Sequence, residues 1–196
     1  MDYVEGMTLE EYIRTVTGPI PSEVAVAIIK EIASAIGYAH KKQIPIPGYN
    51  GVLHLDIKPS NILISNSGKI KVIDYGISQG SKEDRMDQIV GSLMYMAPEQ
   101  LQLESTLDHR TDIYALGVLL HQMLTGTTPY SSKDSKDEII RKIQNEPLER
   151  LINIYPHVDN RFQKIIDTAT SKNSDNRFKN CEAFINSIEE INHATN

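Results

Sequence analysis

The chain has 196 residues, of which 40% are hydrophobic, and this suits one compact domain or at most two small ones. The formal net charge of −6 argues against a nucleic-acid-binding protein, and the single cysteine, Cys181, excludes an internal disulfide framework. No apolar run approaches the roughly 20 residues that a membrane helix needs, and residues 1–6 lack the features of a signal peptide. These properties predict a soluble, cytoplasmic protein that binds neither nucleic acid nor membranes.

The first part of the chain carries two helix patterns. Thr8 and Glu11 have the spacing of a capping box, which predicts a short helix that stops before Gly18. A long helix with one buried face is expected from Ser22 to about Lys42, because apolar residues recur there at three- and four-residue spacing. This apolar face consists of Val24, Ile28, Ile32, Ile36 and Ala39.

A β-hairpin is expected in the next part of the chain, where two short apolar runs flank the turn sequence 66–69. If Ser65 pairs with Ile70 across a four-residue turn, the same register places Asn61 opposite Asp74. The hairpin would then bring an amide and a carboxylate together.

The remainder of the chain is predicted to be helical. A strongly apolar helix is expected from Asp112 to Leu124 and would end at Gly126. Further amphipathic helices are expected at 134–145, 158–171 and 180–192. The sequence therefore predicts a mainly α fold with a small β-hairpin.

The candidate chemical groups surround the hairpin. Asn61 and Asp74 would present an amide oxygen and a carboxylate to the same point, which suits Mg²⁺, an ion that takes few protein ligands together with phosphate oxygens. Asp56 can orient a nucleophile and accept its proton, and Lys58 supplies a positive charge for a phosphate. These residues favour phosphoryl transfer, in which positioning and charge neutralisation do most of the catalysis.

Several motifs resemble those of eukaryotic-type Ser/Thr protein kinases. Residues 54–61, His-Leu-Asp-Ile-Lys-Pro-Ser-Asn, resemble the catalytic loop of that family. Asp74-Tyr75-Gly76 is similar to the family's metal-binding Asp-Phe-Gly, and Ala97-Pro98-Glu99 resembles the motif that closes the activation segment. Residues 112–117 resemble the start of the central buried helix, and residues 1–6 resemble the hinge.

The resemblance implies a kinase-like C-terminal lobe, a helical bundle that occupies residues 1–196 from the hinge onward. Within it, the hinge would span residues 1–6 and the catalytic loop residues 54–61. The activation segment would span residues 74–99, and residues 100–196 would form the helical remainder.

The resemblance also implies roles for individual residues. Asp56 would be the catalytic base, Lys58 would contact the γ-phosphate of ATP, and Asn61 and Asp74 would bind Mg²⁺. Ser92 would belong to the loop that faces a protein substrate. The Lys-Pro-Ser sequence that begins at Lys58 points to Ser/Thr rather than Tyr substrates.

Four further positions are expected to be structural. Glu99 would form an ion pair with Arg177, and Asp112 would be a buried N-cap that braces the catalytic loop. His54 would be a packed histidine and not a proton carrier.

The first lobe of the kinase family has no counterpart in these residues. The sequence contains no Gly-x-Gly-x-x-Gly loop and no lysine in a Val-Ala-Ile-Lys context. Val4 and Leu63 would form one wall against adenine, and missing upstream sequence would have to supply the other wall. We therefore expect the chain alone to be a very poor enzyme. Leu55 replaces an arginine that receives an activation-loop phosphate in many family members, and residues 41–53 look like an insertion.

Two hypotheses follow. The first is the catalytic region of a Ser/Thr protein kinase that transfers the γ-phosphoryl group of ATP to protein hydroxyls. The alternative is a kinase-derived binding or scaffold module without catalysis. The intact Asp56, Lys58, Asn61 and Asp74 favour the first, whereas the missing first lobe favours the second.

Overall fold

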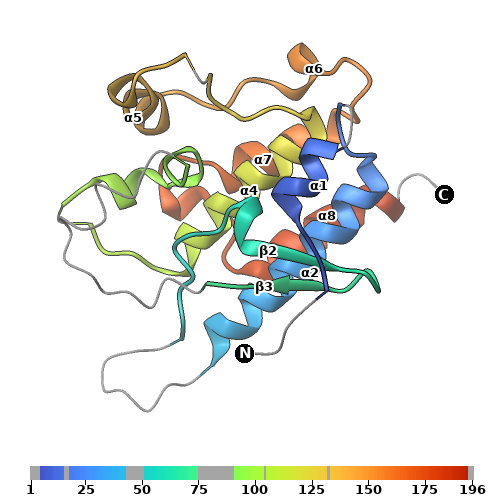
Figure 1. Ribbon diagram of the computed structural model, residues 1–196. Coiled ribbons are helices and arrows are strands. Elements are labelled where there is room, and N and C mark those ends of the chain that lie inside the picture. Colours follow the sequence, from blue (N-terminus) through green and yellow to red (C-terminus); the bar gives the residue numbers. More distant parts are fainter. Residues whose placement is uncertain are drawn as a thin grey trace.

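The computed structural model describes residues 5–15, 18–42, 51–74, 91–103, 105–131 and 133–193. Its helices are α1 (Leu9–Thr15), α2 (Ser22–Lys41), α4 (His109–Thr125), α5 (Lys136–Asn145), α6 (Leu151–Ile154), α7 (Arg161–Ala169) and α8 (Cys181–His193). Its strands are β1 (Gly6–Thr8), β2 (Ile62–Ser65) and β3 (Ile70–Val72) (Figure 1). The expected class, mainly α with little β, is confirmed.

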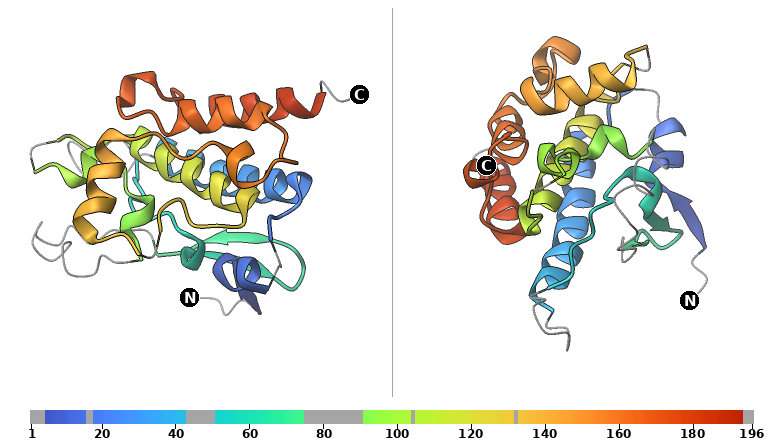
Figure 2. Two further views of the ribbon diagram at one scale, coloured as in Figure 1. Left: turned by 90° about the horizontal axis from the view of Figure 1, so that it is seen from above. Right: turned by 90° about the vertical axis from the view of Figure 1, so that its left-hand side faces the viewer.

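Helix α4 forms the centre of the bundle. Every residue from Thr111 to Thr125 is buried, as expected for a helix that is apolar on nearly all sides. Helix α2 packs on one side of α4 and α7 on another, and α8 packs against both α2 and α7 (Figure 2). The expected buried face of α2 is present, except that Val24 is exposed and its neighbour Ala25 faces the core.

The start of α4 differs from the prediction. The helix begins at His109, and its N-cap is Asp108, whose carboxylate accepts a hydrogen bond of 2.8 Å from the backbone N–H of Arg110. The N-cap prediction for Asp112 was therefore wrong, because two aspartates stand four residues apart and the earlier one caps the helix. Asp112 lies within the first turn of α4. The expected stop is present, since Gly126 ends α4 with a left-handed φ of 72°.

The sheet has three antiparallel strands in the order β1-β2-β3, and β1 was not predicted. The register of the hairpin is one residue away from the prediction. Ile64 pairs with Ile70, and Asn61 therefore lies opposite Ile73 instead of Asp74. The connecting loop has three residues, not four, because Gly68 adopts a φ of 78° that closes a tighter turn.

Helices α1, α5, α7 and α8 lie close to their expected positions, whereas the short helix α6 was not predicted. Helix α5 begins with a capping box between Ser135 and Glu138. Thr8 and Glu11 form the predicted capping box of α1, with Glu11 N–H donating to Thr8 Oγ1 over 3.1 Å. Within the described parts of the chain, no helix is long and apolar enough to cross a membrane.

Candidate active site

The loop at residues 54–61 is anchored to α4 by one buried carboxylate. Asp112 accepts hydrogen bonds of 2.8 Å from the backbone N–H groups of His54 and Leu55. Its Oδ2 atom also lies 2.7 Å from Nε2 of His40, at the end of α2. The Asp112 side chain is fully buried, and a buried carboxylate is tolerated only when such donors satisfy it.

Leu55 has a strained backbone that these contacts hold in place. Its φ of 63° lies in the left-handed region, which costs a non-glycine residue on the order of 1–3 kcal/mol. Asp112 binds the N–H of Leu55, and the side-chain amide of Gln100 donates to its carbonyl oxygen over 3.0 Å. This strained residue directly precedes Asp56, so these contacts fix the direction of the backbone at Asp56.

Asp56 stands in a hydrogen-bonded cluster with the other polar residues of the loop. Its Oδ2 atom is 2.8 Å from Nζ of Lys58 and 3.0 Å from Nδ2 of Asn61, which also donates to the Asp56 carbonyl oxygen over 2.8 Å. Lys58 donates in addition to Oγ of Ser92 over 2.7 Å. The structure therefore brings together Asp56, Lys58, Asn61 and Ser92, which the sequence analysis had singled out.

Asp74 follows β3 in a second strained conformation, with a φ of 54°. The preceding residue, Ile73, is fixed on both sides, because its N–H donates to the carbonyl oxygen of Asn61 and its carbonyl oxygen accepts from Nε2 of His54 over 3.0 Å. Asp74 is exposed and lies one residue beyond the position opposite Asn61. The geometric prediction that Asn61 and Asp74 share an ion stays a prediction.

His54 is buried and has no solvent-exposed surface. Burial lowers the pKa of its imidazole below the usual 6.5, and this outweighs the opposing effects of the Asp112, Asp56 and Asp74 carboxylates. At neutral pH, His54 is therefore a neutral side chain that connects the loop to β3, which is a structural arrangement.

Glu99 and Arg177 form the expected ion pair. Two guanidinium nitrogens of Arg177 donate to the two carboxylate oxygens of Glu99 over 2.6 and 2.8 Å, and Thr111 adds a third donor. Burial raises the pKa of Glu99, but the hydrogen bonds and the positive charge of Arg177 outweigh burial and hold that pKa below its usual value. The Arg177 side chain is fully buried, so this pair ties the segment after Ser92 to the end of the bundle.

The predicted nucleotide-binding residues are only partly described. Leu63 lies in β2, half-buried, with Thr8 of β1 and Lys71 of β3 as its strand partners. Val4 lies outside the described residues. So do Tyr75 and Gly76, the rest of the expected activation segment up to residue 90, and residues 43–50 of the expected insertion.

Sequence reasoning missed two residues that contact the loop and its anchor. Gln100 holds the carbonyl group of Leu55, and His40 binds the carboxylate of Asp112. His40 shows no ligand spacing in the sequence, and Gln100 follows the Ala-Pro-Glu motif directly, which is the one signal that could have drawn attention to it.

A helical bundle of this kind, with an Asp-x-Lys-x-x-Asn loop braced by a buried aspartate, is the arrangement of a protein kinase. The sequence matches the family described as "Protein kinase domain" over residues 1–188, and the chain belongs to this family. It is 35% identical over 191 residues to the "Probable serine/threonine-protein kinase PknB" of Lactococcus lactis, covering 96% of this chain and 29% of that protein.

Two other relatives give the same result. The "Serine/threonine-protein kinase PrkC" of Bacillus subtilis is 38% identical over 186 residues, which cover 93% of this chain and 27% of that protein. The crystal structure of the PknI kinase domain of Mycobacterium tuberculosis is 26% identical and has a TM-score of 0.72, covering 98% of this chain and 65% of that one. The chain thus spans less than a third of these curated relatives and about two thirds of the solved kinase domain.

Proposed function

We propose that this chain is the C-terminal lobe of a Ser/Thr protein kinase and that it contributes the catalytic residues for transfer of the γ-phosphoryl group of ATP to protein Ser/Thr hydroxyls. The observation that carries this proposal is the Asp56 carboxylate. It is hydrogen-bonded to Lys58 and Asn61 at once, on a loop that the buried Asp112 anchors. The part-exposed carboxylate of Asp56 would accept the proton of the substrate hydroxyl.

The donor atoms near Asp56 fit a magnesium ion. Both hydrogen bonds of Asn61 to Asp56 use its Nδ2 atom, so its Oδ1 atom is left as a hard-oxygen ligand. Asp74 adds an exposed carboxylate after β3. Asn61 and Asp74 would hold Mg²⁺, which when bound neutralises phosphate charge and leaves room for phosphate oxygens.

Lys58 and Ser92 would organise the protein substrate. The Lys58 ammonium group lies between the Asp56 carboxylate and the Ser92 hydroxyl, at 2.8 and 2.7 Å. It would supply positive charge for the γ-phosphate and fix the segment that faces the substrate next to the base. In this arrangement, Asp56 moves a proton and Lys58 stabilises charge.

Groups outside these residues would complete the site. Residues 1–196 hold neither a Gly-x-Gly-x-x-Gly loop nor a Val-Ala-Ile-Lys lysine, and the solved PknI kinase domain is longer than the part this chain covers. We propose that an N-terminal lobe supplies these groups, that Val4 and Leu63 contact adenine from below, and that the protein acts in the cytoplasm, where its one thiol would stay reduced.

Transfer of radiolabelled phosphate to a generic Ser/Thr protein substrate tests the proposal. Three forms are compared: the chain alone, the chain preceded by its own upstream lobe where the gene encodes one, and the chain joined to the N-terminal lobe of the PrkC relative. We expect near-background transfer from the chain alone and clear transfer from a completed form. Asp56→Asn should reduce transfer by about 10²–10⁴-fold. Asp74→Asn should abolish it, whereas the exposed Asp137→Asn on α5 is the matched control and should change nothing.

Two outcomes would contradict the proposal. Strong, Asp74-dependent transfer by the chain alone would show that no further lobe is needed. A completed form that folds but transfers no phosphate would favour the scaffold function instead.

A further inference from the structure

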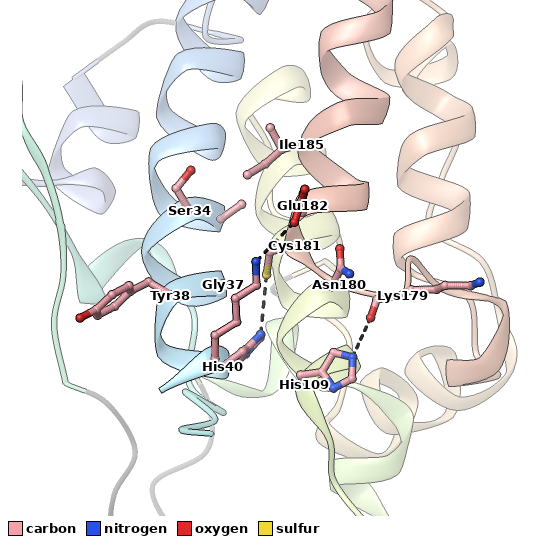
Figure 3. Close-up of a pocket in the computed structure, with 12 residues that line it drawn as sticks. Ser34, Gly37, Tyr38, His40, His109, Lys179, Asn180, Cys181, Glu182 and Ile185 are labelled. Atoms are coloured by element: carbon pink, nitrogen blue, oxygen red, sulfur yellow. Dashed lines mark hydrogen bonds and ion pairs between the residues drawn. The ribbon is translucent and has the colours of Figure 1, made fainter. Parts of the chain in front are cut away.

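A groove of about 670 Å³ opens between α2 and α8, beside the start of α4 (Figure 3). Its volume lies within the range of small-molecule sites in proteins, roughly 300–1,000 Å³. None of Asp56, Lys58 and Asn61 lines it, so it is separate from the catalytic cluster.

Most of the exposed surface inside the groove is apolar. Ala33, Cys181 and Ile185 line it, together with Gly37. A Cβ atom at Gly37 would come within 3.0 Å of the Cβ atom of Cys181, so the glycine lets α2 and α8 approach each other at this point. The walls therefore suit an apolar ligand of modest size.

Aromatic and charged groups also line the groove. The rings of His40 and His109 pack edge to face, with centroids 5.8 Å apart. Lys41 on α2 and Glu182 on α8 form an ion pair of 3.3 Å across the groove, and both side chains are about two-thirds exposed. An exposed pair of this kind contributes at most about 1 kcal/mol, so a ligand anion can replace Glu182 as the partner of Lys41.

The Asn180 side chain also lines the groove and can bind a ligand. The Oδ1 atom of Asn180 caps α8 by accepting from the N–H of Ala183 over 2.8 Å. The cap leaves the two N–H donors of the Asn180 amide for an anionic group.

The floor of the groove is connected to the catalytic loop. Sγ of Cys181 lies 3.8 Å from Nδ1 of His40, and Nε2 of the same ring lies 2.7 Å from Asp112. Asp112 in turn holds the N–H groups of His54 and Leu55. Burial raises the pKa of Cys181 to about 12, so its thiol stays protonated and can donate to Nδ1 while Nε2–H donates to Asp112.

We propose that this groove binds a small amphipathic anion, an apolar ring system that carries a carboxylate or a sulfonate, and that its occupancy acts on the catalytic loop through His40 and Asp112. The ring system would lie on the walls formed by Gly37 and Ile185, and the anionic group would face Lys41 and Asn180. The binding site stands by itself, whereas a regulatory effect on phosphoryl transfer rests on the proposed function.

Binding is tested with 8-anilinonaphthalene-1-sulfonate, whose fluorescence increases in apolar sites, on the folded chain. We expect saturable binding to one site. Ser34→Phe, which fills the groove from α2, should weaken it by about tenfold or more. The matched control is Ser187→Phe, which fills a separate groove between α7 and α8 and should leave binding unchanged.

Two charge-removing substitutions show whether the bound ligand is an anion. Lys41→Gln should weaken binding about two- to fivefold, and Glu182→Gln should strengthen it by a similar factor. Both residues are exposed, so neither change should disturb the fold. Three results would overturn the site. The first is probe binding that does not saturate, and the second is loss of binding in the Ser187→Phe variant. The third is stronger binding in Lys41→Gln together with weaker binding in Glu182→Gln.

Hydrogen exchange tests the connection to the loop without any need for kinase activity. The backbone amides of His54 and Leu55 should exchange more slowly when the groove is occupied, whereas the amides of the hairpin between Ile64 and Ile70 should not change. His40→Phe should still bind the probe but lose this response. Binding with unchanged exchange at His54 and Leu55, or a full response in His40→Phe, would overturn the coupling.

Discussion

The Asp112 carboxylate accepts hydrogen bonds from His40, His54 and Leu55 and has no solvent contact. Sequence reasoning identified Asp112 as the brace of the catalytic loop but took it for the helix N-cap. Spacing alone does not separate these roles, because both place an aspartate near the start of a helix. Only the tertiary position of the loop shows that Asp108 caps and Asp112 braces.

The two aspartates should therefore respond differently to replacement. Asp108→Ala removes an N-cap and should lower the free energy of unfolding by about 0.5–2 kcal/mol. Asp112→Ala leaves buried donors on two elements without a partner and should cost more, on the order of 3–5 kcal/mol. Urea unfolding of both variants measures the difference. Equal losses of unfolding free energy in the two variants would show that Asp112 does not hold the catalytic loop in place.

Two buried histidines predict a loss of stability in mild acid. Burial lowers the pKa of His54 and of His121 below 6.5 in the folded chain. Below pH 6.5 the unfolded chain therefore binds more protons than the folded one, and the free energy of unfolding falls as the pH decreases. Urea unfolding midpoints between pH 8 and about pH 5 record this loss. His121→Gln removes one titrating group and should make the unfolding midpoint depend less on pH. An unchanged pH dependence would contradict the role given to His121.

In the hairpin of β2 and β3, the sequence predicts the strands but not the register in which they pair. The apolar runs predicted both strands, but the register depends on the turn, and Gly68 closes a three-residue loop where the sequence suggested four. This slip moves the partner of Asn61 from Asp74 to Ile73. The strand β1 was missed because three residues carry too little periodicity to be recognised.

Two glycines with positive φ, Gly68 and Gly126, allow the cost of backbone strain to be compared with the cost of a steric clash. Gly68→Ala forces a side chain into the left-handed region in open space and should cost about 1–2 kcal/mol. Gly126→Ala has the same backbone strain, and its Cβ atom would also lie only 2.7 Å from the carbonyl carbon of Gly18. Thermal unfolding should therefore rank Gly126→Ala as the more destabilised variant. The reverse order would mean that the α4 terminus can move away from Gly18.

Across the whole molecule, the sequence predicted the long helices and most members of the site. The spacing of Asp56, Lys58 and Asn61 within one loop made their proximity nearly unavoidable, and the ion pair of Glu99 with Arg177 followed from the family resemblance. The strained backbone of Leu55 and the contacts of His40 and Gln100 were not predictable. These contacts form between elements that are distant in the sequence, so no local sequence pattern predicts them.

We propose that Asn61 of the catalytic loop and Asp74, two residues after β3, form one divalent-ion site beside Asp56. The most direct test is a crystal structure of the lobe-completed chain with Mn²⁺ and a non-hydrolysable ATP analogue, in which anomalous scattering locates the ion. We expect the ion within about 2–2.5 Å of Oδ1 of Asn61 and of the Asp74 carboxylate, with Asp56 outside its ligand shell. An ion bound elsewhere, or no ion between these two side chains at saturating Mn²⁺, would contradict the account.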